Sequence, residues 1–265
     1  MIYYKTFIHQ EEKEWVVLIH GAGGSSSIWY KQIRAYKEHF HVLLVDLRGH
    51  GKSNTNKTER KYTFIDVSKD VLDVMDVLHI EKAHFVGISL GTIIINTLHD
   101  IAPERIHCMI LGGAVTRLTF IAKFLLTLGD KCKYILPYMW IYQLAAWAIM
   151  PRKRHKKSRI LFIKEAKKLC QKEFIRWFKL IKEIDIVHKK TQYNKRDIPK
   201  LYIMGEEDYM FLPPVEKIVK NNQTASLAVI KRAGHVCNVD MPVEFNEVSL
   251  SFLKEKTKKQ PSATY

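Results

Sequence analysis

Short apolar runs rich in β-branched residues alternate along the chain with longer segments whose apolar residues recur every three or four positions. The runs predict buried strands at residues 15–20, 42–47, 83–88, 108–111, 201–204 and 227–230. Between the second and third runs, apolar residues of segment 64–78 repeat at helical spacing and predict an amphipathic helix. This alternation is typical of an α/β fold, in which helices flank a mostly parallel sheet.

The alternation stops after residue 111 and resumes at residue 201. The intervening residues 116–196 predict an inserted helical cap, and residues 1–115 and 197–265 form the core. The insertion contains 21 Lys and Arg against 5 Asp and Glu, an excess equal to the whole chain's net charge of +16. Its apolar stretch at 135–150 is 16 residues long and contains Pro137. A spanning helix needs about 20 apolar residues, so we expect no transmembrane segment.

The four cysteines, Cys108, Cys132, Cys170 and Cys237, are widely separated and match neither a disulfide framework nor a zinc site. The first 13 residues do not combine a basic segment, an apolar run and a cleavage site, so they do not resemble a signal peptide. These observations predict a cytoplasmic protein with reduced thiols, and they predict no metal site.

A candidate nucleophile lies in the segment Gly87-Ile88-Ser89-Leu90-Gly91, between a predicted strand and a predicted helix. A G-x-S-x-G segment in that setting is typical of a sharp turn that exposes the central serine. Side chains two positions before or after Ser89 would collide with the packed strand and helix, which explains Gly87 and Gly91. Ser89 is therefore the predicted nucleophile.

A serine hydroxyl needs a base to take its proton and an acid to orient that base. Asp208 and His235 each follow a predicted strand, where open α/β sheets place their active sites. The order Ser89, Asp208, His235 is the one expected for such a fold. Glu206 and Glu207 are close enough to compete with Asp208 as the acid, but we expect both to face solvent.

Backbone N–H groups must stabilise the oxyanion that forms when a serine attacks a carbonyl. We expect one from Leu90, at the start of a helix, and the second from Ala22 in the glycine-rich turn that begins at Gly21. That turn is similar to a dinucleotide-binding motif, but Ser26 stands where its third glycine belongs. His20, just before the turn, is predicted to be a structural hydrogen-bonding residue.

Together these motifs resemble the α/β-hydrolase superfamily over the whole chain apart from the insertion. The resemblance lies in five segments in order: His20-Gly21, the D-x-R-G-x-G-x-S loop from Asp46 to Ser53, the elbow from Gly87 to Gly91, Gly205 to Asp208, and Gly234-His235. It implies an eight-stranded, mostly parallel sheet with a helical cap inserted after the sixth strand. It also implies a serine hydrolase that needs no cofactor.

The predicted activity is hydrolysis of a small to medium carboxylic ester through an acyl-enzyme. Thioesterase, C–C bond hydrolase, perhydrolase and aminopeptidase activities remain open, as does a receptor that binds a small molecule without turnover. The insertion is rich in aromatic and Met residues, and an apolar lining would favour acyl or alkyl groups over sugars or phosphates.

The basic charge of the insertion raises the question of a polyanionic partner. Residues 152–157 contain no interleaved aromatic residue, so we expect no specific nucleic-acid binding. The preceding residues 134–150 are apolar and aromatic, and an apolar surface beside basic residues suits reversible contact with an anionic membrane. The alternative is a solvated basic face. The sequence makes no prediction of oligomeric state.

Overall fold

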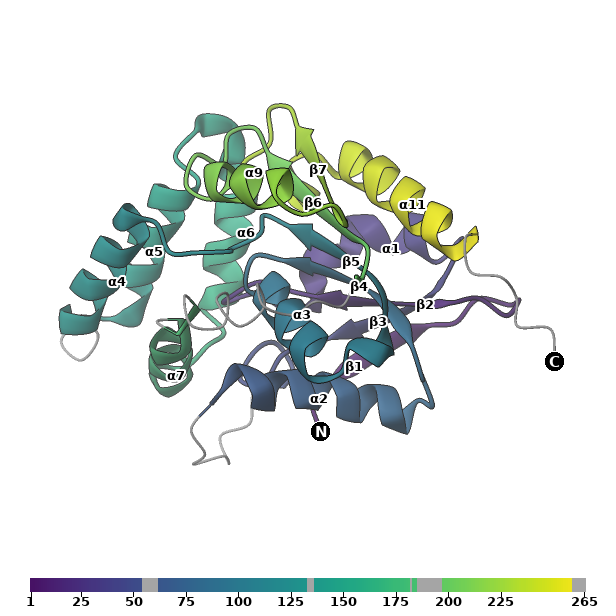
Figure 1. The fold of residues 1–265 in the computed structure, drawn as a ribbon. Helices are drawn as coiled ribbons and strands as arrows, with labels where there is room; N and C mark the ends of the chain where they lie inside the picture. The colour runs from purple at the N-terminus through teal and green to yellow at the C-terminus, as the bar shows by residue number, and fades with distance from the viewer. Residues whose placement is uncertain (54–61, 133–135, 182, 185–196, 259–265) are drawn as a thin grey trace.

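The computed structural model describes residues 1–53, 62–132, 136–181, 183–184 and 197–258, which form a seven-stranded sheet flanked by helices (Figure 1). The strands are β1 Tyr4–Phe7, β2 Trp15–Ile19, β3 His41–Val45, β4 Ala83–Ile88, β5 Ile106–Gly112, β6 Lys200–Gly205 and β7 Ala225–Ile230. Their order is β1-β3-β2-β4-β5-β6-β7, and only the β1–β3 pairing is antiparallel in this sheet of described residues. The predicted α/β class is confirmed.

The sheet differs from the prediction at one edge. The described residues form seven strands rather than eight. Strand β1 lies at the edge of the sheet, and residues 1–3 before it form no further strand. The six predicted strands are all present. Strand β1 was not predicted, since its four residues, Tyr-Lys-Thr-Phe, are mostly half-buried and form no continuous apolar run.

Helices cover both faces of the sheet because the buried strands carry apolar residues on both sides. Val17 and Ile19 of β2 pack in a cluster with helices α2 (Phe64–Val77) and α3 (Leu90–Ile101). Val16 and Leu18 point the opposite way and pack with α1 (Tyr30–Tyr36) and α11 (Pro242–Lys258). Helix α9 (Leu212–Lys220) contacts β6 and β7, and the short α10 (Cys237–Asp240) contacts α11.

Helix α2 confirms the amphipathic segment predicted at 64–78. Thr63 caps its N-terminus by accepting a hydrogen bond from the Asp66 N–H, while the Asp66 carboxylate accepts one from the Thr63 N–H. This reciprocal pair satisfies two N–H groups that a helix start leaves without carbonyl partners. Val67, Val71 and Val74 form the buried stripe that faces the sheet.

In the described part of the chain between β5 and β6, four longer helices lie at the left of the sheet in Figure 1: α4 Phe120–Cys132, α5 Tyr138–Ile149, α6 Lys156–Ala166 and α7 Gln171–Ile181. We call them the cap helices. They enclose a small core of their own that includes Tyr142, Phe174 and Phe178. Residues 133–135, 182 and 185–196 of the predicted insertion lie outside the described residues, and its boundaries at 116 and 196 stay a prediction. No described helix is both long and apolar enough to cross a membrane.

Candidate active site

Ser89 lies at the tight turn that joins β4 to α3. Its backbone has φ 53° and ψ −115°, a conformation that non-glycine residues rarely adopt. A Cβ added at Gly91 would lie 2.3 Å from the carbonyl oxygen of Ile19, and one at Gly87 would lie 2.7 Å from the carbonyl carbon of Gly91. The Ser89 N–H donates to the carbonyl of Gly112 at 2.9 Å. The two glycines therefore allow the close packing that holds Ser89 in this conformation.

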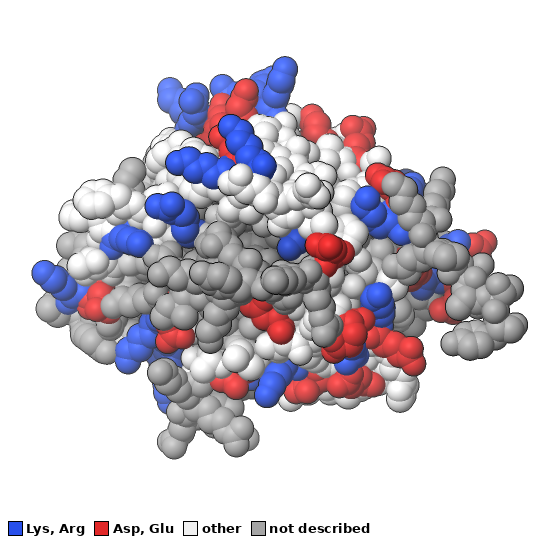
Figure 2. Space-filling model, in the orientation of Figure 1, with Lys and Arg blue, Asp and Glu red and all other residues white. Residues whose placement is uncertain are grey.

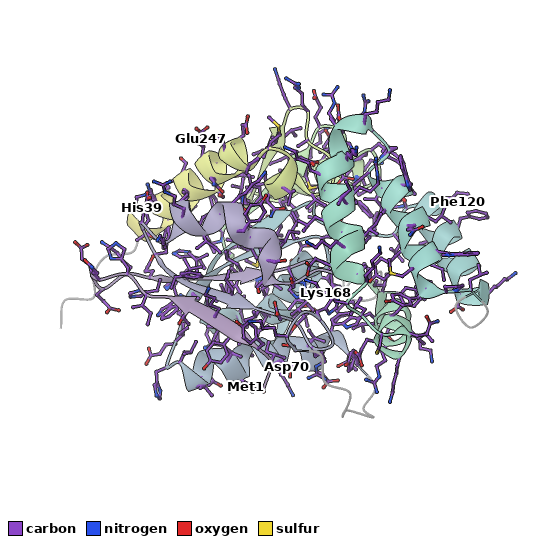
Figure 3. The ribbon with its side chains drawn as sticks, turned by 180° about the vertical axis from the view of Figure 1, so that it is seen from behind. Met1, His39, Asp70, Phe120, Lys168 and Glu247 are labelled. Atoms are coloured by element: carbon purple, nitrogen blue, oxygen red, sulfur yellow. The ribbon has the colours of Figure 1, made fainter. Side chains whose placement is uncertain are left out.

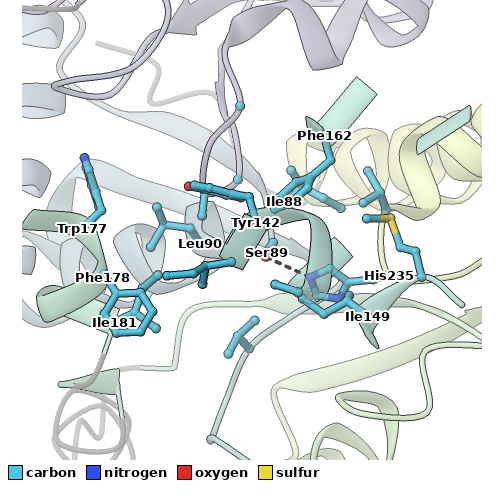
Figure 4. A pocket seen from close by; sticks show the side chains of 18 of the residues that line it. Ile88, Ser89, Leu90, Tyr142, Ile149, Phe162, Trp177, Phe178, Ile181 and His235 are labelled. Atoms are coloured by element: carbon cyan, nitrogen blue, oxygen red, sulfur yellow. Dashed lines mark hydrogen bonds between the residues drawn. The ribbon is translucent and has the colours of Figure 1, made fainter. Parts of the chain in front are cut away.

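His235 connects Ser89 to Asp208. Its Nε2 atom is 2.9 Å from the Ser89 hydroxyl oxygen, a contact marked in Figure 4, and its Nδ1 atom is 2.8 Å from Asp208 Oδ2. An ionised carboxylate can only accept, so the Nδ1–H donates to Asp208 and leaves Nε2 free to accept from Ser89. His235 is buried in the loop that follows β7, and Asp208 is buried in the loop that follows β6. The structure thus brings together the three residues predicted to act on the substrate.

Phe211 supports this arrangement, although the sequence analysis did not single it out. Its backbone N–H donates to Asp208 Oδ1 at 3.3 Å, and its ring lies 4.9 Å from the imidazole of His235. The carboxylate of Asp208 is therefore held by a backbone donor on one oxygen and by His235 on the other. No sequence motif marks Phe211, because its role depends on the way the loop after β6 folds back.

Ala22 and Leu90, the two predicted oxyanion donors, line the same cavity as Ser89. Leu90 is the first residue of α3, where N–H groups have no carbonyl partner within the helix. A Cβ on Gly21 would lie 3.3 Å from both the Ser89 Cβ and the Ile88 carbonyl oxygen, which shows how closely the glycine-rich turn approaches the elbow. Their role in stabilising an oxyanion stays a prediction.

Two buried histidines shape the glycine-rich turn. His20 Nδ1 donates to the carbonyl of Gly21 at 2.8 Å, and its Nε2 accepts from the Leu47 N–H at 2.9 Å. His50 Nε2 accepts from the Gly23 N–H at 3.0 Å. Burial lowers the pKa of His20 and lowers that of His50 to about 3, so both rings stay neutral near pH 7. His20 has the structural role predicted for it, whereas His50 was missed despite its place in the D-x-R-G-x-G-x-S loop.

A cavity of about 500 Å³ lies between Ser89 and the cap helices (Figure 4). Its walls are almost entirely apolar and come from α5, α6 and α7 as well as the core. Figure 4 shows Tyr142, Phe162 and Phe178 around the Ser89–His235 pair. The described lining includes no Lys or Arg side chain, and its one carboxylate is Glu165. Glu165 is buried and paired, because it accepts from the Ser25 hydroxyl at 2.7 Å and from Lys168 at 2.6 Å.

Glu206 and Glu207, the competing acids, occupy different environments. Glu206 is exposed, as expected, and accepts from the Arg232 N–H at 3.1 Å. The expectation that Glu207 faces solvent is wrong, since its side chain is only 8% exposed. Its Oε2 is 2.8 Å from Nε2 of the buried His155, the N-cap residue just before the cap helix α6. Glu207 therefore links the loop of Asp208 to the cap rather than orienting His235.

Other polar contacts tie the cap to the loops that surround Ser89. Asp240 accepts from the Ser158 hydroxyl at 2.6 Å and from the Gly234 N–H at 2.9 Å, so one carboxylate joins α6 to the loop of His235. On the other side of the cavity, the Trp177 indole donates to the Arg48 carbonyl at 3.1 Å. The cap is therefore anchored at both ends of the cavity.

Within the described residues, no group of three or more His, Cys, Asp or Glu side chains is arranged to hold a metal ion. The glycine-rich turn that is similar to a dinucleotide motif is also used differently. Asp46 accepts from the backbone N–H groups of Ser26 and Lys52 at 2.7 and 2.8 Å, so its carboxylate braces two loops. It is not turned toward an open nucleotide-binding surface, being only 2% exposed.

The fold matches that of known proteins. The α/β-hydrolase fold family model matches residues 14–128. A solved structure of a hydrolase from Pseudomonas aeruginosa PA01 superimposes with a TM-score of 0.81 at 25% identity, over 94% of this chain and 93% of that one. The chain has the α/β-hydrolase fold.

The curated relatives of this α/β-hydrolase-fold chain are named as hydrolases. An uncharacterized carboxylesterase, nap, from Bacillus subtilis is 26% identical over 91% of this chain and 80% of its own length. A 3-oxoadipate enol-lactonase from Acinetobacter baylyi is 40% identical, but over 76 residues, which span 27% of that enzyme. The higher identity is thus confined to a part of the chain.

Proposed function

We propose that the protein is a serine hydrolase that cleaves a carboxylic ester by way of an acyl-enzyme. The observation that carries the proposal is the hydrogen-bonded series Ser89, His235, Asp208 at 2.9 and 2.8 Å, opening on an apolar cavity. The similarity to a carboxylesterase supports it. A small-molecule ester is the proposed substrate, and no cofactor takes part in the proposed reaction.

In this reaction Ser89 Oγ attacks the ester carbonyl while its proton passes to His235 Nε2. Asp208 stabilises the imidazolium that forms, and the backbone N–H groups of Ala22 and Leu90 donate to the oxyanion. The imidazolium then protonates the departing alcohol, which leaves Ser89 acylated. Water, deprotonated by His235, attacks the acyl group and releases the acid with Ser89 restored.

The cavity favours an ester that is neutral and apolar on the side facing the cap. A charged carboxylate placed there would lose its hydration without a described Lys or Arg to compensate, and Glu165 would repel it. We therefore expect p-nitrophenyl esters of straight-chain acids to be cleaved faster than the hemisuccinate, which is of similar size but negatively charged. Equal or higher kcat/KM for the hemisuccinate would contradict this specificity.

The experiment that tests the function is labelling with a fluorophosphonate, followed by turnover of p-nitrophenyl esters from C2 to C16 beside matched thioesters. Ser89→Ala is expected to abolish labelling and to lower kcat by several orders of magnitude without unfolding the chain, because the bond-forming atom is lost. Labelling that persists in this variant would refute the assignment of Ser89. One equivalent of product without further turnover would favour a receptor, and preference for thioesters would favour a thioesterase.

We also propose a cytoplasmic location. Cys108, Cys170 and Cys237 are unpaired, which supports a reducing environment. Burial raises the pKa of the Cys108 and Cys237 thiols, so neither is activated for reaction.

A further inference from the structure

The outer end of the cap presents large apolar side chains to solvent. On α5, Trp140, Leu144 and Trp147 follow one another at intervals of four and three residues, so they share one face, and each is more than half exposed. On α4, Phe120 is 85% exposed and Phe124 is 60% exposed. Figure 3 shows Phe120 at the outer end of the cap, away from the sheet. We call these five residues the cap patch.

The cap patch continues into the cavity above Ser89. Trp140 and Leu144 are exposed to solvent and also line the cavity, as does Leu126 of α4. The same side chains therefore form the outer surface of α5 and part of the cavity wall. A substrate that reaches Ser89 along this wall passes over the patch.

The charged residues of the cap divide by location. Helix α6 carries the exposed Lys156 and Lys164, and the exposed Lys167 follows its last residue. Their spacings are eight and three residues, and the exposed Ile160 lies between the first two. Two cap carboxylates, Glu165 and Glu173, are buried and paired instead. The described surface of the cap is consequently rich in Lys and Arg. Figure 2 shows such side chains over the upper left of the molecule, and many Asp and Glu at the lower right.

An aromatic side chain and a basic one join the two surfaces. The guanidinium of Arg159 on α6 lies 3.6 Å from the ring centroid of Trp147 on α5. This cation–π contact places the apolar face of α5 next to the helix that carries the exposed lysines. Apolar and basic groups therefore lie on adjoining helices, the combination that binds the interface of an anionic membrane.

We propose that the cap patch and the α6 lysines dock reversibly on an anionic lipid surface, with the cavity mouth turned toward the lipid. The aromatic residues insert at the level of the headgroups, and the lysines approach the lipid phosphates. A basic surface without apolar neighbours is explained by contact with solvent alone. The cap patch, however, exposes Phe and Trp side chains, which contact with lipid would bury. Docking needs no chemistry at Ser89, so it can be tested independently of the proposed hydrolysis.

The test is co-sedimentation of the full chain carrying Ser89→Ala with vesicles of phosphatidylglycerol or of phosphatidylcholine. We expect binding to phosphatidylglycerol at low salt, a large loss at high salt, and little binding to phosphatidylcholine. Each lysine near an anionic surface is worth about a fivefold change in partitioning, so losing three lysines should weaken binding about a hundredfold. The triple variant K156E/K164E/K167E also reverses the charges and should therefore bind at least that much more weakly. The variant F120S/F124S removes apolar contact without changing charge and should also weaken binding.

The matched control is K217E/K220E/K231E, which changes the net charge by the same amount at three exposed lysines outside the cap. It should bind far better than the cap triple variant. Equal losses in the two triple variants would show that net charge alone drives adsorption and would overturn the proposal. Absence of phosphatidylglycerol binding at low salt would overturn the proposal too. If the chain instead binds duplex DNA under the same conditions, the basic surface serves nucleic acid rather than lipid, and the proposal is equally overturned. Far-UV circular dichroism establishes that each variant is folded.

Discussion

Replacing Glu207 with Gln tests whether the cap is held by a carboxylate rather than by apolar packing alone. The substitution keeps the size of the side chain but removes its charge. Glu207 is 2.8 Å from His155 Nε2, and its two oxygens lie 3.5 and 3.3 Å from the guanidinium groups of Arg152 and Arg154. His155 Nδ1 is buried with no described hydrogen-bond partner, so Glu207 supplies the polar contact that this ring has among the described residues.

The expected cost follows from these contacts. A hydrogen bond to a buried charged group contributes about 1.5–3 kcal/mol, and each partly exposed arginine adds about 0.2–1 kcal/mol. These contributions sum to about 2–5 kcal/mol, and Glu207→Gln should lower the free energy of unfolding by the lower part of that range, about 2–3 kcal/mol, because an amide oxygen can still accept a hydrogen bond from His155. At about 2–4 °C per kcal/mol for a chain of this size, Tm falls by roughly 4–12 °C. KM should rise more than kcat falls, because the cap forms the cavity wall while His235 and Asp208 stay in place.

Glu206→Gln is the matched control, because it makes the same chemical change one residue earlier on an exposed side chain. Among the described residues its carboxylate accepts one backbone hydrogen bond, so the loss should stay within about 0.5 kcal/mol. Differential scanning fluorimetry and kinetics on the preferred ester compare the two variants. Equal shifts in Tm would refute the role of Glu207 in holding the cap. If Glu206→Gln or Glu207→Gln abolishes turnover while Asp208→Asn stays active, then Asp208 is not the acid that orients His235.

Three further predictions concern other parts of the molecule. Asp208→Asn should lower kcat by on the order of 10³–10⁴-fold, because an amide cannot stabilise the imidazolium of His235; steady-state kinetics with near-normal activity would contradict this. Gly205→Ala would place a Cβ 2.2 Å from the Gly234 carbonyl oxygen and should displace the loop of His235, which lowers kcat/KM by about 100-fold. An unchanged kcat/KM in this variant would contradict the prediction. A hydrogen bond from His84 lowers the pKa of Glu14 to about 2, so its contribution to stability is complete above about pH 4.5 and is lost as the pH falls toward 2. Urea titrations of Glu14→Gln should show a lower free energy of unfolding at pH 7 and a smaller loss of it between about pH 4.5 and 2. A loss equal to that of the unsubstituted chain would show that other groups cause it.

The residues around Ser89 were predictable because each lies in a short motif with a local physical reason. Gly87 and Gly91 are required by backbone contacts at the elbow, and the glycine at 21 by the approach of its turn to Ser89. Asp208 and His235 follow strands that the apolar pattern identifies. Parallel strands then bring their carboxyl ends to one edge of the sheet. The sequence therefore indicates both the residue types and their meeting place.

Contacts between distant segments were not predictable in the same way. Glu207 looks like one of two adjacent surface glutamates, and only the fold places His155 above it. His50 carries no obvious signal apart from its loop, yet it accepts a hydrogen bond from Gly23, which is 27 positions away. Strand β1 depends on pairing with β3 across 34 or more residues, and such pairing leaves no trace in local apolar periodicity.

The chain divides two tasks between two parts of the molecule. Loops of the sheet carry Ser89, Asp208 and His235, whereas cap helices supply most of the apolar wall that a substrate would touch. Transplanting a cap from another protein of this fold should therefore change the cavity wall while leaving the atoms of Ser89, Asp208 and His235 as they are. The graft would need counterparts of His155 and Ser158, which bond to Glu207 and Asp240 beside those atoms. Chimeras that lack these two attachment points should fold around the sheet and yet leave the cavity without a firm roof.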